Sequence, residues 1–280
     1  MTSSIAFGGF PLTGTSPGGG ALTVQSLDGW LSRALRRERQ DRAQQSGAWP
    51  STGQDSALPI TVRGQAVYST DVAAAAERRT ILALGGQGVS DFTVTDPAGI
   101  GTRQVELDAL IVSPVRDAMF TYSLVVTACD PVMYGPLTFA STSLSGTAGG
   151  TGLVYPLAYP LNYGVAPGVT PGALTLLNGG TTSYWPRLRI DGPVPNPRVT
   201  LVETGDTIRY GATLAAGQWL DIDCANRRVL LNGQVSVRHL VSSSGSWLAI
   251  PTGGGSITWT ADAADPNAEL SVWGYEGAWT

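Results

Sequence analysis

Residues 184–234 read YWPRLRIDGPVPNPRVTLVETGDTIRYGATLAAGQWLDIDCANRRVLLNGQ. Apolar residues recur here at every second position, as in the pairs Leu188 with Ile190 and Leu220 with Ile222. Turn-forming steps such as Asp-Gly, Pro-Asn-Pro and Asn-Gly separate these pairs. Period-two alternation between turn residues is typical of antiparallel strands, and several short strands at close spacing indicate a β-sandwich or barrel. The stretch contains no nucleophile motif, metal-ligand cluster or phosphate loop, so by itself it predicts a fold and no reaction.

The composition limits the class of protein. At 280 residues the chain is long enough for one or two domains, each with its own core. Only 14% of the residues are charged, against about 25% in typical globular domains, whereas the chain has 36 Gly and 18 Pro. This profile favours a β-rich extracellular or virion protein over a cytosolic enzyme. The net charge of −4 gives no broad electrostatic reason to bind nucleic acid.

Three further features of the sequence carry little chemistry. All 17 basic residues are Arg, which we attribute to the codon bias of a GC-rich genome, with Arg at subunit contacts as the functional alternative. Cys129 and Cys224 lie far apart and outside any CxxC spacing, which predicts two free thiols and no zinc site. The N-terminus lacks the pattern of a secretory signal, and no run of 18 apolar residues predicts a membrane span.

Residues 1–140 predict an α+β domain. Alternating stretches at 58–68, 91–95, 103–112 and 119–129 predict strands, with Gly64 as a candidate bulge. Between the first two, an Ala-rich run predicts a helix that begins at Thr70 or Asp71 and ends at Gly85-Gly86. We expect this helix to cover one face of a sheet.

Residues 33–42 (RALRRERQDR) are ambiguous on local grounds. Their helix propensity is high, and Leu31 lies four residues before Leu35 with charges around both, which favours a helix. The apolar face is narrow, however, and no core stripe continues past Leu35. Helix is the local prediction, and strand is the alternative.

Residues 141–170 predict a linker and the entry to a strand, because residues 141–152 (STSLSGTAGGTG) are small and uncharged. Residues 171–280 then contain about ten short alternating stretches, a density typical of a two-sheet sandwich. The sequence therefore predicts a mainly β chain with a sandwich as its C-terminal domain.

Candidate catalytic residues are few. His239 is the only histidine, and the chain has no GxSxG motif, so we reject a Ser-His-Asp triad and a histidine metal site. Asp221 and Asp223 flank Ile222 and predict one strand face, which hairpins could bring near Glu203 or Asp206. Paired carboxylates serve glycoside hydrolysis or calcium binding. Strand alternation alone predicts a solvent-facing polar row, which is the simpler interpretation.

Two other patterns have structural explanations. The GGQG run at 85–88 follows the predicted helix, so it lies at the wrong end for a phosphate loop. The Arg residues between 33 and 42 are interrupted by Glu38 and Asp41, which favours a solvated face or a subunit contact over a nucleic-acid patch.

The tryptophans allow two interpretations. Aromatic side chains on a β-sandwich can form a stacking platform for sugars, and they are also the large core residues that such a fold needs. We predict that Trp219, Trp247 and Trp259 are core, because each lies within an apolar strand.

The turn motifs of the quoted stretch resemble the C-terminal region of the distal tail proteins of long-tailed bacteriophages, which is a galectin-like β-sandwich. The motifs that carry the resemblance are Ile190-Asp191-Gly192, Asn196-Pro197, Thr204-Gly205, Asp221-Ile222-Asp223, Arg228-Val229 and Leu231-Asn232-Gly233. In the first half, residues 46–49 (SGAW), residues 60–66 (ITVRGQA) and the predicted helix resemble the N-terminal belt domain of the same family. Cys224 departs from the small hydroxyl residue often found at its position.

The resemblance implies a structural component of the virion at the phage tail tip, a distal tail or minor tail protein. It implies that the belt domain (1–140) closes into a homohexameric ring around a conduit through which DNA passes without specific binding. The sandwich (171–280) would project outward as an adaptor. The implied partners are the tail tube protein, the tail-tip or baseplate hub, the tape measure protein and a receptor-binding protein. No enzymatic activity, catalytic residue, metal or cofactor is implied, and residues 33–42 would form a strand that leads into a long loop.

Two other functions remain as alternatives. A carbohydrate-binding module that holds a host-surface glycan would need exposed aromatic residues, for which the candidates are Tyr155, Tyr159, Trp185 and Trp279. A glycan hydrolase would need two of Glu203, Asp206 and Asp221 to meet as a carboxylate pair in a cleft.

Overall fold

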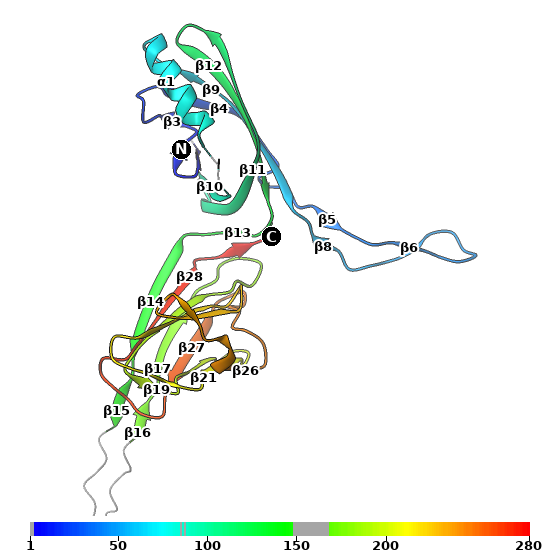
Figure 1. Ribbon diagram of the computed structural model, residues 1–280. Helices are drawn as coiled ribbons and strands as arrows, with labels where there is room; N and C mark the ends of the chain where they lie inside the picture. Colours follow the sequence, from blue (N-terminus) through cyan, green and yellow to red (C-terminus); the bar gives the residue numbers. More distant parts are fainter. Residues whose placement is uncertain (1–2, 85, 87, 148–167) are drawn as a thin grey trace, which may run out of the picture. The chain divides into compact units, whose positions relative to one another are not determined.

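A computed structural model of the chain describes residues 3–84, 86, 88–147 and 168–280. The chain divides into two compact units, the first formed by Met1–Pro136 with Trp279–Thr280 and the second by Leu137–Ala278. Both units consist mainly of antiparallel strands, and the first also contains an α-helix (Figure 1). This confirms the predicted mainly β fold class. No helix among the described residues is both long enough and apolar enough to span a membrane.

The first unit is one large sheet with a helix and an arm. Its main sheet has the order β2-β1-β10-β11-β12-β9-β4-β3. The elements are β1 (Ser4–Phe7), β2 (Phe10–Pro11), β3 (Gly14–Thr15), β4 (Ala21–Asp28), β5 (Leu35–Arg36), β6 (Gln40–Asp41), β7 (Ala48–Trp49), β8 (Gln54–Asp55), β9 (Leu58–Val67), α1 (Asp71–Leu82), β10 (Val89–Asp96), β11 (Gly99–Arg116), β12 (Met119–Ala128) and β13 (Met133–Tyr134).

Strand β11 is shared by the two halves of the main sheet, which pack on each other. Its first part pairs with β10 as far as Glu106, and its second part pairs with β12. The register shifts between Leu107 and Ala109, so Asp108 forms a bulge where the pairing partner changes. The Thr127 hydroxyl donates a hydrogen bond to the Asp108 carboxylate at 2.6 Å. Because a bulge bends a strand and increases its local twist, one continuous sheet can fold back over itself.

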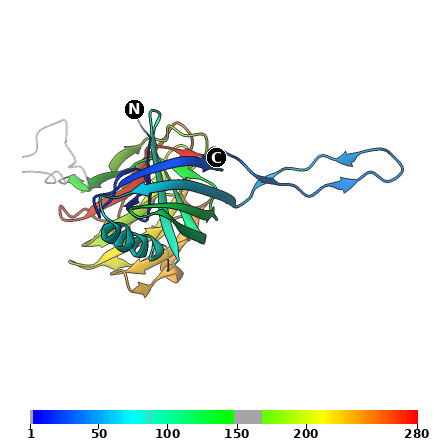
Figure 2. The same cartoon turned by 90° about the horizontal axis from the view of Figure 1, so that it is seen from above.

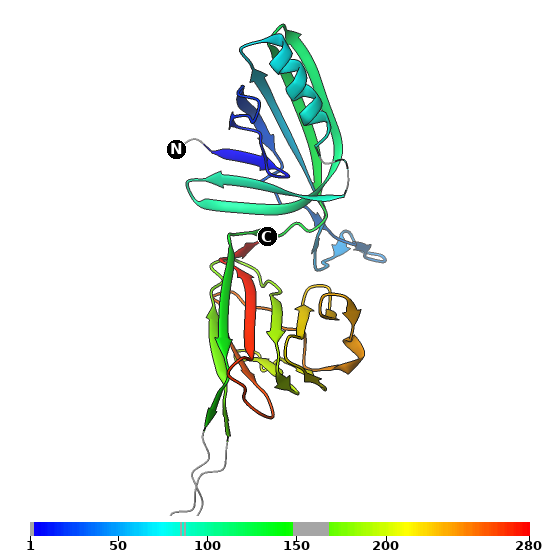
Figure 3. The same ribbon diagram turned by 60° about the vertical axis from the view of Figure 1, so that its left-hand side comes forward.

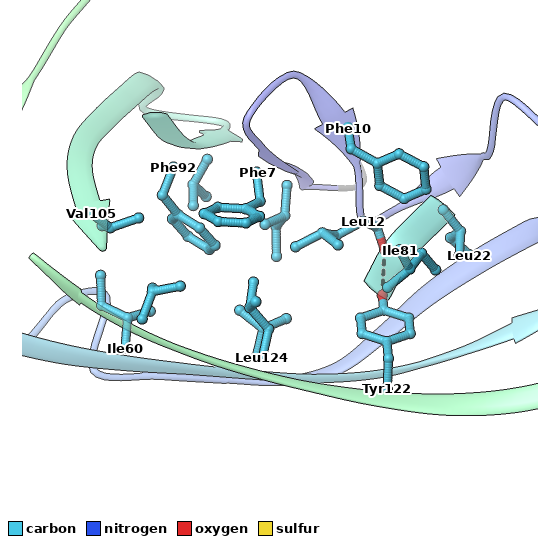
Figure 4. Packing of buried hydrophobic residues seen from close by; sticks show 14 of the residues in the cluster. Phe7, Phe10, Leu12, Leu22, Ile60, Ile81, Phe92, Val105, Tyr122 and Leu124 are labelled. Atoms are coloured by element: carbon cyan, nitrogen blue, oxygen red, sulfur yellow. Dashed lines mark hydrogen bonds between the residues drawn. The ribbon is translucent and has the colours of Figure 1, made fainter. Parts of the chain in front are cut away.

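The core lies between the long strands β9 and β12 and a cover formed by β1, β10 and α1 (Figure 4). Phe7 and Phe92 come from the cover, Ile60 and Leu124 come from the long strands, and all four are buried. Along β9 and β12, buried residues alternate with more exposed ones, as the sequence pattern predicts. Burial of one such side chain contributes about 1.5–3 kcal/mol, so this packing stabilises the unit.

The Tyr122 side chain crosses the core and leaves no space for a side chain at position 64, which is glycine. The Tyr122 hydroxyl donates a buried hydrogen bond to the Leu12 carbonyl oxygen at 2.6 Å. A Cβ atom at Gly64 would lie 2.4 Å from the Tyr122 hydroxyl and 2.7 Å from the Thr23 carbonyl oxygen. Gly64 is therefore required for close packing. The bulge predicted at Gly64 lies instead on the neighbouring strand β4, where the register shifts between Val24 and Ser26.

Helix α1 forms close to its predicted place and covers the sheet (Figure 3). Thr70 is the N-cap, and its hydroxyl oxygen accepts a hydrogen bond from the Ala73 N–H at 3.2 Å. The helix ends at Leu82 with Ala83 as the C-cap, before the predicted Gly85-Gly86, of which Gly85 lies outside the described residues. The residues of α1 that are buried are Ala74, Glu77 and Ile81.

Residues 31–57, which we call the arm, extend away from the sheet of the first unit as a long hairpin (Figure 2). Within it β5 pairs with β8 and β6 pairs with β7. The helix predicted locally for residues 33–42 is therefore wrong, and the strand implied by the family resemblance is correct. Leu31 is 83% exposed and Leu35 41% exposed. Without a core to bury a helical apolar face, helix propensity alone does not hold a short helix.

The second unit is a sandwich of two antiparallel sheets. Their orders are β14-β28-β18-β23-β24-β25 and β17-β27-β20-β21-β26. The elements are β14 (Leu137–Ser143), β15 (Ser145–Thr147), β16 (Gly168–Thr170), β17 (Gly172–Leu176), β18 (Arg187–Asp191), β19 (Val194–Pro195), β20 (Arg198–Leu201), β21 (Thr207–Tyr210), β22 (Thr213–Leu214), β23 (Trp219–Asp223), β24 (Arg228–Leu231), β25 (Val235–Ser236), the 3-10 helix η1 (Arg238–Leu240), β26 (Val241–Ser244), β27 (Gly255–Thr260) and β28 (Glu269–Tyr275), and β29 (Ala278–Trp279) follows at the division between the units.

The opening stretch of the sequence supplies the centre of this sandwich. Leu188 and Ile190 on β18 pair with Ile222 and Leu220 on β23, and all four are buried. From the other sheet, the buried residues include Val199, Leu201, Ile208, Ile257 and Trp259. The period-two pattern thus assigned the inward face of these strands correctly.

The division of the chain differs from the predicted boundaries. We expected the first domain to run to 140 and a linker to occupy 141–170. Instead β14 begins at Leu137 and pairs along its whole length with β28, and β15 pairs with β16. Small residues such as Ser and Thr suit an edge strand as well as a linker, so composition alone did not separate β14 from a linker. The remainder of the predicted linker, 148–167, lies outside the described residues.

Replacing Gly64 with Ala tests the packing around Tyr122. We expect Gly64→Ala to destabilise the chain by about 1–3 kcal/mol, because the added methyl group displaces Tyr122 or the backbone of Thr23. The control is Gly86→Ala, whose Cβ would meet only the Ala83 carbonyl oxygen at 3.8 Å, and it should change stability by less than about 1 kcal/mol. Urea denaturation measures both. Equal stability of the two variants would contradict this packing.

Candidate functional site

Asp221 does not join Glu203 and Asp206, the other candidate acids. Asp221 lies on β23 of the six-stranded sheet, whereas Glu203 and Asp206 lie in the β20–β21 turn of the other sheet. There Glu203 accepts hydrogen bonds from the Ser256 N–H at 2.8 and 2.9 Å. Asp206 accepts one from the Ser246 N–H at 2.6 Å. These two carboxylates thus organise turns by accepting backbone hydrogen bonds, and Asp221 lies on the other sheet.

The other candidate ligands are also separate. No group of His, Cys, Asp or Glu that could hold a metal ion exists among the described residues. His239 is exposed and lies in η1, not in the strand expected for residues 236–241 (SVRHLV), because that segment turns between β25 and β26. Asp223 faces outward, as alternation predicts. Burial raises the pKa of Asp223. Hydrogen bonds from Asn226 and the charges of Arg228 and Arg187 together lower it by more, so its pKa lies below the ordinary value.

The second unit does contain a groove, which we call the aromatic groove, with a volume of about 700 Å³. It lies on the outer side of the six-stranded sheet, opposite the core. Its lining residues are Leu137, Trp185, Arg187, Arg189, Trp219, Asp221, Gly233, Trp273 and Tyr275. They come from β14, β18, β23, β28 and the segments beside them.

Strand register brings these side chains together. Arg187 on β18 is paired with Trp273 on β28, on one side, and with Asp223 on β23, on the other. Arg189 is paired in the same way with Asp221. Because paired residues on neighbouring strands point to the same side of a sheet, charged and aromatic side chains share the outer face.

Trp219 and Arg189 form the fixed part of the groove. The Arg189 guanidinium carbon lies 4.7 Å from the centre of the Trp219 ring, a cation–π contact. Its Nε and Nη2 atoms donate hydrogen bonds of 2.7–3.0 Å to Asp191. The hydrogen bonds to Asp191 raise the pKa of Arg189 above its ordinary value, and the charges of Asp191 and Asp221 add to this shift. Arg189 is therefore held in place and charged.

Arg187 and Asp221 form the open polar part. The Trp219 indole Nε1–H donates a hydrogen bond to Asp221 Oδ2 at 3.2 Å. Asp221 Oδ1 lies 4.0 Å from Arg187 Nη2, which is too long for a hydrogen bond. The Arg187 side chain is 60% exposed, and among the described residues it has only this ion-pair contact. The two groups thus offer a donor and an acceptor to a ligand in the groove.

Trp185 is placed at the rim by the residue before it. Tyr184 is fully buried and its N–H donates to the Ile250 carbonyl oxygen at 3.2 Å, which anchors the chain inside the sandwich. The next residue, Trp185, then faces outward and is 47% exposed. Trp273 also lies at the groove, with its ring 5.3 Å from the ring of the exposed Phe139.

The glycan-contact candidates from the sequence are distributed unevenly. Trp185 lines the aromatic groove. Trp279 is half-buried, does not line this groove and is grouped with the first unit. Tyr155 and Tyr159 lie outside the described residues.

Sequence reasoning missed most of the groove. Trp247 and Trp259 are buried, as expected, but the assignment of Trp219 to the core is wrong, because it is only half-buried and lines the outer face. The signal was present: Trp219 lies two residues before Asp221, so it shares the face of that carboxylate. The place of Trp273 and Tyr275 at the groove follows from the pairing of β28 with β18, which brings together residues far apart in sequence.

Residues 179–272 match the model of the siphovirus-type tail component, C-terminal domain. No curated protein matches the chain in sequence. These residues form most of the sandwich, so the match lies on the second unit.

Solved structures extend the likeness to the whole chain. The SPP1 Dit protein, described as a paradigm of the hub adsorption apparatus in phages that infect Gram-positive bacteria, has a TM-score of 0.62 at 11% identity, with 100% of both chains covered. A chain of the phage P2 baseplate in its activated conformation with Ca has a TM-score of 0.55 at 9% identity, covering 99% of this chain and 100% of that one. These findings confirm the predicted resemblance to siphophage distal tail proteins and the predicted fold.

The two cysteines test the strand register that builds the groove. Cys224 follows Asp223, faces inward and is 1% exposed, and burial raises the pKa of its thiol. Cys129 is exposed. We expect N-ethylmaleimide to add once to the native protein, at Cys129, and twice after unfolding in urea, as measured by peptide mass spectrometry. Rapid labelling of native Cys224 would mean that β23 presents the opposite face.

Proposed function

We propose that this protein is a non-enzymatic structural component of the tail tip of a long-tailed bacteriophage. The match of residues 179–272 to the siphovirus-type tail component is the observation that carries the proposal. The fold of the whole chain, which is similar to that of the SPP1 Dit protein, supports it. In this proposal the first unit closes into a homohexameric ring and the second unit serves as an adaptor.

The arm supports a contact between copies through its exposed apolar residues. Leu31 is 83% exposed and Trp49 is 59% exposed, and the arm buries none of the core. The Arg42 guanidinium lies 4.9 Å from the centre of the Trp49 ring. A projecting two-stranded hairpin is marginally stable by itself, so a neighbouring surface that covers it would explain its persistence.

Charge supports the same contact. Residues 33–55 contain five Arg and three acidic residues, a formal charge of +2, whereas the chain as a whole carries −4, which leaves −6 for the rest. A basic arm is thus attracted to the acidic surface of the next copy. Such a contact joins two different surfaces, and a head-to-tail contact of this kind closes into a ring when its rotation permits.

An open strand edge offers a second contact. Strand β4 pairs with β9 along its length, but on its other side only Ala21 and Leu22 are paired, with β3. Unpaired backbone groups on an edge strand are a template for pairing with another chain. In the proposed ring this edge is covered by a neighbouring copy.

The proposed ring leaves a conduit through which DNA passes without specific binding. Its proposed partners are the tail tube protein on one side and, on the other, the baseplate hub, the tape measure protein and a receptor-binding protein. The low charge of the chain, 14% of its residues, suits surfaces that are buried in an assembly.

Shortening the arm tests the ring. The Ser56 N–H donates to the Ala34 carbonyl oxygen at 2.9 Å, so residues 35–55 can be replaced by Asn-Gly, a two-residue hairpin turn. We expect the native chain to reach six times the monomer mass, alone or bound to tail tubes, in native mass spectrometry and electron microscopy. The shortened variant should stay monomeric with an unchanged melting temperature.

Trp185→Ala, which changes only the exposed rim of the aromatic groove, is the matched control and should still form the ring. A native chain that stays monomeric with and without tail tubes, or a ring of another symmetry, would contradict the hexamer. A shortened variant that still assembles would exclude the arm as the contact.

A further inference from the structure

We propose that the aromatic groove of the second unit binds a neutral saccharide, with aromatic rings stacking on the sugar and Arg187 and Asp221 bonding its hydroxyl groups. The proposal rests on the groove alone and holds whether or not the first unit forms a ring.

The aromatic residues of the groove lie outside the sandwich core, although the Tyr275 ring also contacts the ring of the buried Tyr184 at 5.7 Å. The inner face of the same sheet is filled by Leu188, Ile190, Leu220 and Ile222, all at most 1% exposed. Trp219, Trp273 and Tyr275 lie on the opposite face and are half-buried, and Trp185 is 47% exposed. Four aromatic side chains around one groove are more than scattered surface apolar residues, and such clusters mark binding sites.

The polar groups have the arrangement that hydroxyl groups require. A hydroxyl both donates and accepts a hydrogen bond. Arg187 Nη2 and Asp221 Oδ1 face each other at 4.0 Å, so a sugar hydroxyl can accept from the first and donate to the second. Asp221 is further fixed by the Trp219 indole N–H, and its side chain is only 18% exposed. The acceptor is thus preorganised before a ligand arrives.

Charge balance selects an uncharged ligand. Arg189 is neutralised by its hydrogen bonds to Asp191, and Arg187 stands beside Asp221. The lining itself has two guanidinium groups and one carboxylate, and Asp191, just outside it, supplies the second carboxylate. These four groups carry no net charge together, so an anionic polymer gains no overall attraction. An uncharged ligand avoids the cost of bringing another charge beside Asp221.

Size and chemistry favour a sugar over a protein. The groove volume of about 700 Å³ falls within the range of about 300–1,000 Å³ typical of small-ligand sites. A protein partner would require a broader contact, about 800 Å² on each side for a standard interface. A sugar ring combines the two properties that the groove matches, an apolar face of C–H groups and an equatorial belt of hydroxyls.

The test is binding to an array of neutral hexose and N-acetylhexosamine oligosaccharides printed beside acidic ones, followed by calorimetric titration of the strongest ligand. We expect the full chain to bind neutral saccharides. Trp185→Ala should weaken binding at least tenfold through loss of stacking, and Trp185→Tyr should restore part of it. Arg187→Ala should weaken binding similarly, because its donor is lost.

Trp49→Ala is the matched control, since it also removes one exposed tryptophan, but from the arm. It should bind saccharides as the native chain does. Absence of binding to every neutral saccharide, preference for acidic ones, equal binding by Trp185→Ala, or occupation of the groove by another protein would each overturn the proposal. Ring formation measured on the same preparations stands apart: a ring without saccharide binding refutes only the groove, and binding without a ring refutes only the hexamer.

Discussion

A β-strand has two faces, and in a sandwich one of these faces packs in the core. In the second unit, burial of Leu188 and Ile190 on β18 and of Leu220 and Ile222 on β23 fixes which residues face outward. A slip of one residue would bury two arginines and two aspartates and expose the apolar row, which is prohibitively unfavourable. The positions of Arg187, Arg189, Trp219 and Asp221 are thus a consequence of core packing, and the groove needs no separate folding signal.

In the first unit, a bulge interrupts the regular alternation of inward and outward residues. Strand β11 pairs with β10 along its first part and with β12 along its second part, and Asp108 forms a bulge where the partner changes. Because a bulge bends a strand, it helps a single sheet to enclose its own core. Phe7 and Phe92 on one layer can then meet Leu124 on the other (Figure 4). The bulge is a feature that alternation of apolar residues does not reveal.

The limits of prediction follow from this physics. Local alternation identified the strands and their inward faces, and the N-cap at Thr70 identified the start of the helix. Residues 33–42 were predicted wrongly because propensity is local, whereas a helix needs a partner for its apolar face, and Leu31 and Leu35 have none in the core. The groove was largely invisible because Trp273 joins Arg187 only through the pairing of β28 with β18, a contact between residues far apart in sequence.

The groups proposed to carry function are those that the cores leave unused. The arm contributes nothing to the core of the first unit, yet it concentrates Arg and exposes Trp49. The outer face of the six-stranded sheet does not form the sandwich core, yet it holds four aromatic residues around the pair of Arg187 and Asp221. Exposed aromatic side chains gain little stability from folding, since their transfer from water is incomplete. Their presence on a sparsely charged chain therefore argues for contacts that form after folding, through the arm in assembly and through the groove in recognition.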